Sequence, residues 1–184
     1  MMLRSGHFAQ AYEVFVGDYD PAGQPDYEYV PASGHVPGTR ICVDPFTGPS
    51  WTGSFAADAS GERGVSGLFG TPGPEWLCVV QRGTPFLVNV LDPAQGSIVA
   101  VGGPVRVVEQ LVEQFLLLLV TSWTITAVGV GVPLWTTSRI AIEEVRVDEV
   151  IDGVLFGVAD PDAVEPRDFT VDQRTGEVVD GAGV

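Results

Sequence analysis

Residues able to carry catalytic or metal chemistry are few in this chain and stand far apart. Its 184 residues include two histidines, two cysteines and no lysine, since all nine basic residues are arginine. His7 and His35 do not show the spacing of zinc ligands, and two cysteines make neither a Cys-rich zinc site nor a disulfide framework. The absence of lysine excludes P-loop phosphate binding and Schiff-base chemistry.

The sequence also lacks the residue patterns that are typical of hydrolases. A Ser–His–Asp triad would have to recruit His7 or His35, and Gly64-Val65-Ser66-Gly67 lacks the G-x-S-x-G pattern of a nucleophile elbow. A carboxylate pair for glycoside hydrolysis is defined by its separation in space, so the sequence selects none. These residues favour a protein without enzymatic activity, and we expect no cofactor.

A loop near the N-terminus has the spacing of a calcium site. Asp18 and Asp20 take the first and third ligand positions of an EF-hand loop, and Gly23 takes the sixth. Ala22 stands where a ligand is needed and Tyr29 where the bidentate glutamate should be, so the motif fails. We expect a solvated loop there and no bound metal.

Acidity is the strongest compositional signal. The chain has 24 acidic and nine basic residues, a net charge of −15 and a pI near 4.2. Nucleic acids and anionic membranes need clustered positive charge, so neither is an expected partner. Residues 143–184 alone carry twelve acids and three arginines. Within them, a cluster could bind a basic protein or a cation, or form a solvated face: Glu143, Glu144, Asp148, Glu149 and Asp152.

All four tyrosines lie near the N-terminus. Tyr19, Tyr27 and Tyr29 are candidate partner-binding residues, because a tyrosine ring supplies contact area and its hydroxyl a polar group. The alternative is that they cover the edges of the core. Residues 1–38, which contain them, are interpreted as a Tyr/Pro/Gly-rich leader that precedes a single domain at 39–184.

The elements that must position these residues are strands. Apolar or β-branched runs of five to eight residues recur between turn signals such as Arg82-Gly83 and Asp160-Pro161-Asp162. This spacing predicts an all-β domain of antiparallel strands, arranged as a sandwich or as partial propeller-like sheets. The expected strands are 12–16, 40–44, 51–55, 76–81, 85–91, 97–101, 115–120, 124–128, 134–139, 144–151, 154–159 and 167–172.

One apolar stretch is long enough to span a bilayer. The 21 residues from Phe115 to Trp135 carry no charge. Gly129, Gly131 and Pro133 interrupt the stretch and its near flanks are acidic, so we expect two or three buried strands instead of a membrane span. The N-terminus shows no export signal, which favours the cytoplasm, where Cys42 and Cys78 are expected to be reduced and buried.

A turn motif occurs twice. Asp44-Pro45-Phe46-Thr47-Gly48 is echoed by Asp172-Gln173-Arg174-Thr175-Gly176. The D-x-x-T-G pattern predicts a tight turn between strands, in which Asp accepts backbone hydrogen bonds and Gly takes the left-handed conformation. Residues 127–135 likewise pass from an expected strand through a glycine turn to a tryptophan.

These hairpins resemble the outer-strand turns of quinoprotein-type β-propeller blades. From about Pro74 to Gly181 the chain also resembles an uncharacterised group of small bacterial all-β proteins, on segments that include Trp76-Leu77-Cys78-Val79-Val80, 127–135 and Phe169-Thr170-Val171-Asp172. The resemblance implies a compact antiparallel β fold with blade-like hairpins, and it implies no activity.

The segment 105–115 has two interpretations. Its apolar residues Val108, Leu111, Val112 and Phe115 fall at helical spacing, which predicts one short amphipathic helix. The resemblance instead implies strand, turn and strand entry over the same residues.

Taken together, the residues predict a non-catalytic acidic β module that acts by protein–protein interaction with a basic protein. An immunity- or antitoxin-like protein is the sharper version of this hypothesis. The alternative is a small-ligand-binding protein or hydrolase whose pocket is lined by tryptophans, although tryptophans in all-β folds are more often core anchors. Those residues are Trp51, Trp76, Trp123 and Trp135.

Overall fold

The computed structural model describes residues 7–17, 23–32, 34–59 and 64–181. These residues form sixteen strands and no helix, in four sheets of four strands each. Every strand pair is antiparallel except β2 with β4. The predicted all-β class is confirmed.

Each sheet is built from consecutive strands. Sheet 1 has the order β1-β3-β4-β2 and contains β1 (Tyr12–Val16), β2 (Tyr27–Tyr29), β3 (His35–Pro45) and β4 (Trp51–Asp58). Sheet 2 contains β5 (Gly67–Gly70), β6 (Trp76–Gln81), β7 (Thr84–Asn89) and β8 (Asp92–Ile98). Sheet 3 contains β9 (Val107–Leu111), β10 (Leu116–Val120), β11 (Ile125–Val128) and β12 (Pro133–Thr136). Sheet 4 contains β13 (Val145–Ile151), β14 (Val154–Ala159), β15 (Arg167–Asp172) and β16 (Val178–Asp180).

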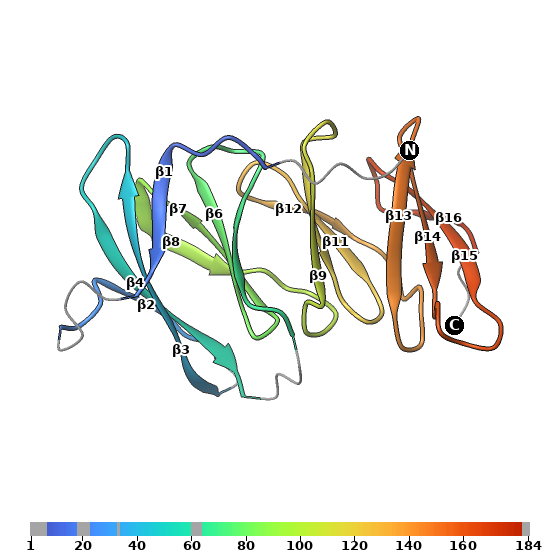
Figure 1. Cartoon of the computed structure of the whole chain (residues 1–184), viewed down its shortest axis with the longest axis horizontal. Helices are drawn as coiled ribbons and strands as arrows, with labels where there is room; N and C mark the ends of the chain where they lie inside the picture. Colours follow the sequence, from blue (N-terminus) through green and yellow to red (C-terminus); the bar gives the residue numbers. More distant parts are fainter. Residues whose placement is uncertain (1–6, 18–22, 33, 60–63, 182–184) are drawn as a thin grey trace.

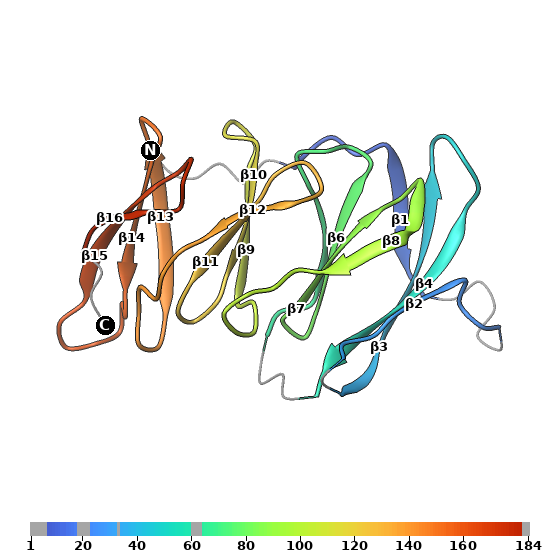
Figure 2. The same cartoon turned by 180° about the vertical axis from the view of Figure 1, so that it is seen from behind.

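The four sheets stand in a row along the long axis of the molecule, in chain order. Figure 1 shows sheet 1 at the left and sheet 4 at the right, and Figure 2 shows the same row from behind. Sheets 2 and 3 therefore have a neighbouring sheet on both faces, whereas sheets 1 and 4 have one on a single face.

An apolar cluster fills each of the three junctions. Tyr12, Ile41 and Phe55 of sheet 1 pack with Leu77 and Phe86 of sheet 2. A second cluster joins sheets 2 and 3 through residues such as Cys78, Leu87, Leu117 and Leu119, and a third joins sheets 3 and 4 through residues such as Leu118, Ile125, Leu155 and Phe169. Because a strand's side chains alternate between two faces, the middle strands must be apolar at every position. All five residues of β10 are accordingly buried.

The segment 105–115 contains a strand and a turn, so the helical interpretation is wrong. Val107–Leu111 form β9, which pairs with β10, and residues 112–115 make the turn between them. Val108 packs towards sheet 2 and Leu111 towards sheet 4. Apolar residues directed to both sides of a strand produced a spacing that resembles a helical one.

From Tyr12 on, the described part of residues 1–38 contributes to sheet 1, whereas Phe8 before it packs between sheets 2 and 3. The part from Tyr12 on supplies β1, β2 and the start of β3, and β1 pairs with β3 along its full length from Tyr12 to Val16.

The D-x-x-T-G turn has its predicted geometry in the second copy. Oδ1 of Asp172 accepts hydrogen bonds from the backbone N–H groups of Arg174 and Thr175, both at 2.9 Å, and from the Thr175 hydroxyl at 3.1 Å. Gly176 has a φ of 73° and its N–H donates to the Asp172 carbonyl at 2.8 Å. Gly48, at the end of the first copy, also has a positive φ, of 113°.

Candidate functional site on the outer face of the last sheet

Sheet 4 presents one broad face that no described segment covers. Leu155 and Ala159 of β14 are buried against sheet 3, so the alternating side chains of Val154, Phe156 and Val158 point the other way. These three residues are half-buried and form an apolar stripe along the middle of the face.

Acidic residues from three strands surround this stripe. Glu149 of β13 pairs in register with Phe156, Asp168 of β15 pairs with Val158, and Asp180 of β16 pairs with Thr170. Asp148 occupies the bulge between Val147 and Glu149. Glu149, Asp168, Asp180 and Asp148 line a shallow depression of about 300 Å³ whose floor includes Phe156 and Thr170. We call this surface, with Val154 and Val158, the outer face of sheet 4.

One of the three arginines of residues 143–184 pairs with a carboxylate of this face. Nε of Arg146 donates to Oδ1 of Asp148 at 2.8 Å, and this hydrogen bond raises the pKa of the guanidinium. Nη2 of Arg167 lies 3.4 Å from Oδ2 of Asp160. Arg167 is the first residue of β15, and Asp172 is the last. Residues 143–184 hold twelve acids against three arginines, so the end of the row formed by sheet 4 is strongly negative.

Sheet 1, at the other end of the row, has its outer face partly covered by its own chain. Cys42 points away from sheet 2 yet is only 3% exposed, and its Sγ lies 3.4 Å from the Gly17 carbonyl. Nη1 of Arg40 donates to the Gly23 carbonyl at 2.8 Å. Segments of the same chain therefore contact part of the outer face of sheet 1.

Glu143 and Glu144 lie apart from this depression, in the connection that precedes β13. Their backbone N–H groups donate to Oδ1 of Asp160, at 2.7 and 3.2 Å, and their side chains are exposed. Oδ1 of Asp160 also accepts the N–H of Ile142 at 3.0 Å. Burial raises the pKa of Asp160, but these N–H donors and Arg167 lower it more, so the pKa lies below its ordinary value.

The tyrosines lie at the opposite end of the molecule from the acidic residues. Tyr29 is 8% exposed, stacks on Phe55 with 4.4 Å between ring centroids, and donates its hydroxyl to the Pro93 carbonyl at 2.7 Å. The half-buried Tyr27 makes an edge contact with Trp51. Tyr19 lies outside the described residues, as do Asp18 and Asp20 of the calcium-like loop. In the structure, Asp148 and Glu149 line the same depression, whereas Tyr27 and Tyr29 lie in sheet 1, away from both acidic residues.

Phe156, Asp168 and Asp180 are among the residues of this face that were not singled out as site residues from the sequence. Alternation along 167–172 places Asp168 on the same side as Thr170, so its outward direction was available. Its closeness to Asp148 was not, because this depends on how β13, β14 and β15 pair.

The four tryptophans do not share a pocket. Three donate their indole N–H to a backbone carbonyl at 2.9 Å: Trp51 to Val90, Trp123 to Ile142 and Trp135 to Gln173. Trp76 lies against Gly131 of sheet 3. Each tryptophan contacts a different part of the chain, and Trp51, Trp76 and Trp135 each join two neighbouring sheets.

Both cysteines are buried and free, as expected. Burial raises the pKa of the Cys78 thiol to about 12, so Cys78 is not a nucleophile at neutral pH.

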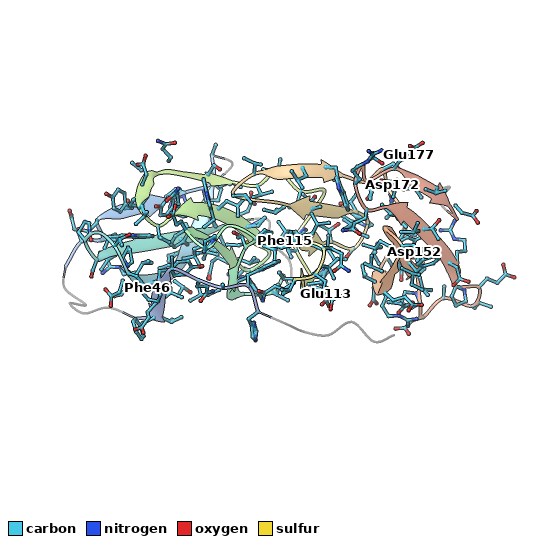
Figure 3. The ribbon with its side chains drawn as sticks, turned by 90° about the horizontal axis from the view of Figure 1, so that it is seen from above. Phe46, Glu113, Phe115, Asp152, Asp172 and Glu177 are labelled. Atoms are coloured by element: carbon cyan, nitrogen blue, oxygen red, sulfur yellow. The ribbon has the colours of Figure 1, made fainter. Side chains whose placement is uncertain are left out.

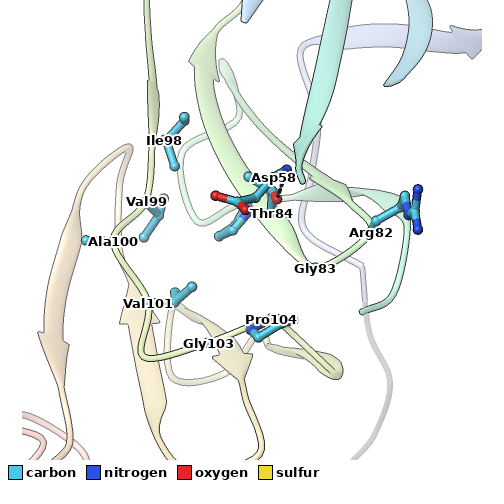
Figure 4. Close-up of a pocket in the computed structure, with 11 residues that line it drawn as sticks. Asp58, Arg82, Gly83, Thr84, Ile98, Val99, Ala100, Val101, Gly103 and Pro104 are labelled. Carbon is cyan, nitrogen blue, oxygen red and sulfur yellow. Dashed lines mark hydrogen bonds between the residues drawn. The ribbon is translucent and has the colours of Figure 1, made fainter. Parts of the chain in front are cut away.

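A second cavity lies between the end of β4 and the segment after β8. It has a volume of about 280 Å³, and the backbone N–H of Asp58 donates to Thr84 Oγ1 at 3.0 Å on its wall. Figure 4 shows Arg82 directed away from the cavity. Among the described residues that line it, Asp58 is the single carboxylate and none is histidine or cysteine. This wall offers no acid–base pair.

Comparison with known proteins adds no family. No protein-family model matches the chain, and no curated protein matches it in sequence. Over the residues that the structure describes, no group of three or more His, Cys, Asp or Glu side chains could hold a metal ion. The same residues contain no helix that could cross a membrane.

Proposed function

We propose that this chain is a non-catalytic binding module and that the outer face of sheet 4 docks a basic protein. The observation that carries the proposal is the apolar stripe of Val154, Phe156 and Val158 inside a rim of carboxylates. An apolar centre within a polar rim is the usual anatomy of a protein–protein interface.

Charge selects the class of partner. Glu149, Asp168 and Asp180 come from three strands and converge on one depression. A partner with arginines or lysines around an apolar centre would pair with these carboxylates while it covers Phe156. The net charge of −15 would also steer such a partner in solution, and salt would weaken that steering.

A protein partner is favoured over a cation by the way the acids are arranged. No group of three or more His, Cys, Asp or Glu side chains among the described residues could hold a metal ion, and Asp148 is already paired with Arg146. A metal site needs several oxygen ligands directed at a common centre.

The sharper form of the proposal is an immunity- or antitoxin-like protein that neutralises a basic partner in the cytoplasm. The acidity of residues 143–184 supports it by analogy. The proposed relation to small bacterial all-β proteins is supported by the succession of four-stranded, blade-like sheets.

Capture experiments with matched variants test the proposal. The tagged protein would be purified from its native cells at low and moderate salt, together with D168N/D180N and with the control E13Q/E75Q. Both variants remove two negative charges, but Glu13 and Glu75 are exposed residues of sheet 1 and of the loop before β6. We expect a stoichiometric basic partner that is lost at moderate salt and bound about ten-fold more weakly by D168N/D180N, a change of about 1.4 kcal/mol.

Equal effects of the two variants would show that overall charge, and not this face, holds the partner. A protein that comes down alone at both salt concentrations would contradict the proposal. The variant E143Q/E144Q adds a third arm, since we expect it to weaken capture less than D168N/D180N does.

A further inference from the structure

A groove of about 550 Å³ lies where the hairpin turns of sheets 3 and 4 meet. One wall is apolar and contains Phe115 of the β9–β10 turn and Leu134 of β12. The other contains Asp152 of the β13–β14 turn and Asp172 at the end of β15. Figure 3 looks onto this edge and shows Phe115 over sheet 3, with Asp152 and Asp172 over sheet 4.

Phe115 is an unfavourable residue at its position in the turn. Its φ of 54° lies in the left-handed region, which is strained for a bulky L-residue. Its side chain is also 68% exposed, so burial does not offset that strain. Of the four described non-glycine residues with positive φ, the other three are polar: Arg82, Asp152 and Asp160. Packing among the described residues therefore does not account for a phenylalanine at this turn.

Leu134 extends the apolar wall. It lies on β12, an edge strand of sheet 3, and is 53% exposed. Phe115 and Leu134 thus give the groove two large apolar side chains that no described segment covers.

The opposite wall is negatively charged. The N–H groups and hydroxyl that donate to Asp172, those of Thr175 first, lower the pKa of its carboxyl, which is ionised at neutral pH. Asp152 is exposed at the tip of its turn. Arg174 is the one cation among the described lining residues, and Glu113 and Glu177 stand on the same edge. The lining itself holds two carboxylates against one guanidinium, which leaves the groove negative.

We propose that this groove binds an extended peptide segment in which an apolar side chain neighbours an arginine or lysine. The apolar side chain packs on Phe115 and Leu134, and the cation pairs with Asp152 and Asp172. Charge complementarity favours this occupant over an acidic or purely apolar segment. The groove shares no lining residue with the depression on the outer face of sheet 4, so either site can fail without the other.

Chemical-shift mapping on the full chain tests this proposal. The ¹⁵N-labelled protein would be titrated with the acetylated, amidated hexapeptide Leu-Arg-Leu-Arg-Leu-Arg, and separately with its Leu-Glu and Ser-Arg counterparts. We expect the Leu-Arg peptide to shift the amide signals of Phe115, Gly153 and Gln173. The Leu-Glu peptide should not bind, and the Ser-Arg peptide should bind about ten-fold more weakly because it lacks apolar side chains.

F115N is the decisive variant, and F46N is its control. Asparagine tolerates the left-handed conformation, so F115N removes the ring and keeps the turn. Phe46 is an equally exposed phenylalanine, at 66%, in the β3–β4 turn of sheet 1. We expect F115N to weaken binding of the Leu-Arg peptide about ten-fold and to leave the fold intact, with F46N unchanged. Unchanged binding by F115N, shifts confined to other surfaces, or no shifts with any peptide would overturn the proposal.

Discussion

The indole ring of Trp135 lies against Gly176, the glycine that ends the β15–β16 turn. A Cβ on Gly176 would come within 2.6 Å of Trp135 Cδ2, and the Trp135 indole N–H donates to the Gln173 carbonyl in the same turn at 2.9 Å. The relationship recurs at the preceding junction, where a Cβ on Gly131 would lie 2.1 Å from Trp76 Cε2. In both cases a turn glycine with positive φ receives a tryptophan from the preceding sheet. These contacts hold successive sheets together in addition to the apolar clusters.

G176A tests this contact, with G153A as its control. Gly176 and Gly153 have similar φ values, of 73° and 80°, but a Cβ on Gly153 would meet nothing within 4 Å. We expect G153A to lower the free energy of unfolding by about 1 kcal/mol, the cost of a left-handed alanine. G176A should cost about 1–3 kcal/mol more, because the methyl group displaces the Trp135 ring. Urea unfolding of the two variants measures the difference, and equal losses would show that the ring moves aside freely.

The sequence predicts several strands closely in both outer and inner sheets, among them 12–16 of sheet 1 and 76–81 of sheet 2. In sheet 4, alternation places Phe169 and Val171 inside and Thr170 and Asp172 outside, and the expected strands 154–159 and 167–172 match β14 and β15. The alternation of apolar and polar residues is absent from β9, because both of its faces pack against a sheet. Val108 contacts sheet 2 and Leu111 contacts sheet 4. The short strands β2, β5 and β16 were also missed, because three or four residues give too little pattern.

The candidate site was only half predictable for a similar reason. Asp148 and Glu149 are adjacent in the chain, so their acidity is visible in the sequence. Asp168 and Asp180 reach them through the pairing of four strands, and the register of that pairing depends on two bulges. Local spacing does not specify which sheets stand next to each other, so it does not indicate which face is left open.

Asp160 should make the free energy of unfolding depend on pH in the acidic range. Its carboxylate accepts three backbone N–H bonds and its pKa lies below its ordinary value, although its burial acts the other way. Its contribution is therefore full above the unfolded pKa of about 3.9 and is lost as the pH falls through the lower folded value. We expect D160N to lose about 2 kcal/mol of unfolding free energy at pH 7, because charged hydrogen bonds are replaced by neutral ones.

The measurement is urea unfolding of wild type and D160N at several pH values. Asp26 and Asp172 also have lowered pKa values, so both proteins keep some acid sensitivity and only the difference between them isolates Asp160. That difference should shrink below about pH 4. A difference independent of pH would mean that the variant acts through packing and not through the charge.

The two thiols should be unreactive until the protein unfolds. Cys42 is 3% exposed and Cys78 is fully buried, with a pKa raised to about 12 by that burial. Because the thiolate is the reactive form, Cys78 of folded molecules should stay unmodified even at pH 8.5. Ellman's reagent with C42S, which leaves Cys78 alone, should report a rate that follows the unfolded fraction in urea. Rapid modification of folded C42S would contradict the buried position of Cys78.

Y29F distinguishes a core anchor from a recognition residue. The Tyr29 hydroxyl donates to the Pro93 carbonyl at 2.7 Å, and its ring stacks on Phe55, so it fastens β2 to sheet 2. Removal of the hydroxyl leaves that carbonyl without its donor and should lower the unfolding free energy by about 1–2 kcal/mol. Y27F removes the same group from a half-buried neighbour whose hydroxyl can bond water, and should cost less than about 0.5 kcal/mol.

Capture of the basic partner by folded Y29F should match that by wild type, since Tyr29 faces sheet 2 at the far end from the acidic face. Weaker capture with unchanged stability would instead place Tyr29 at the binding surface.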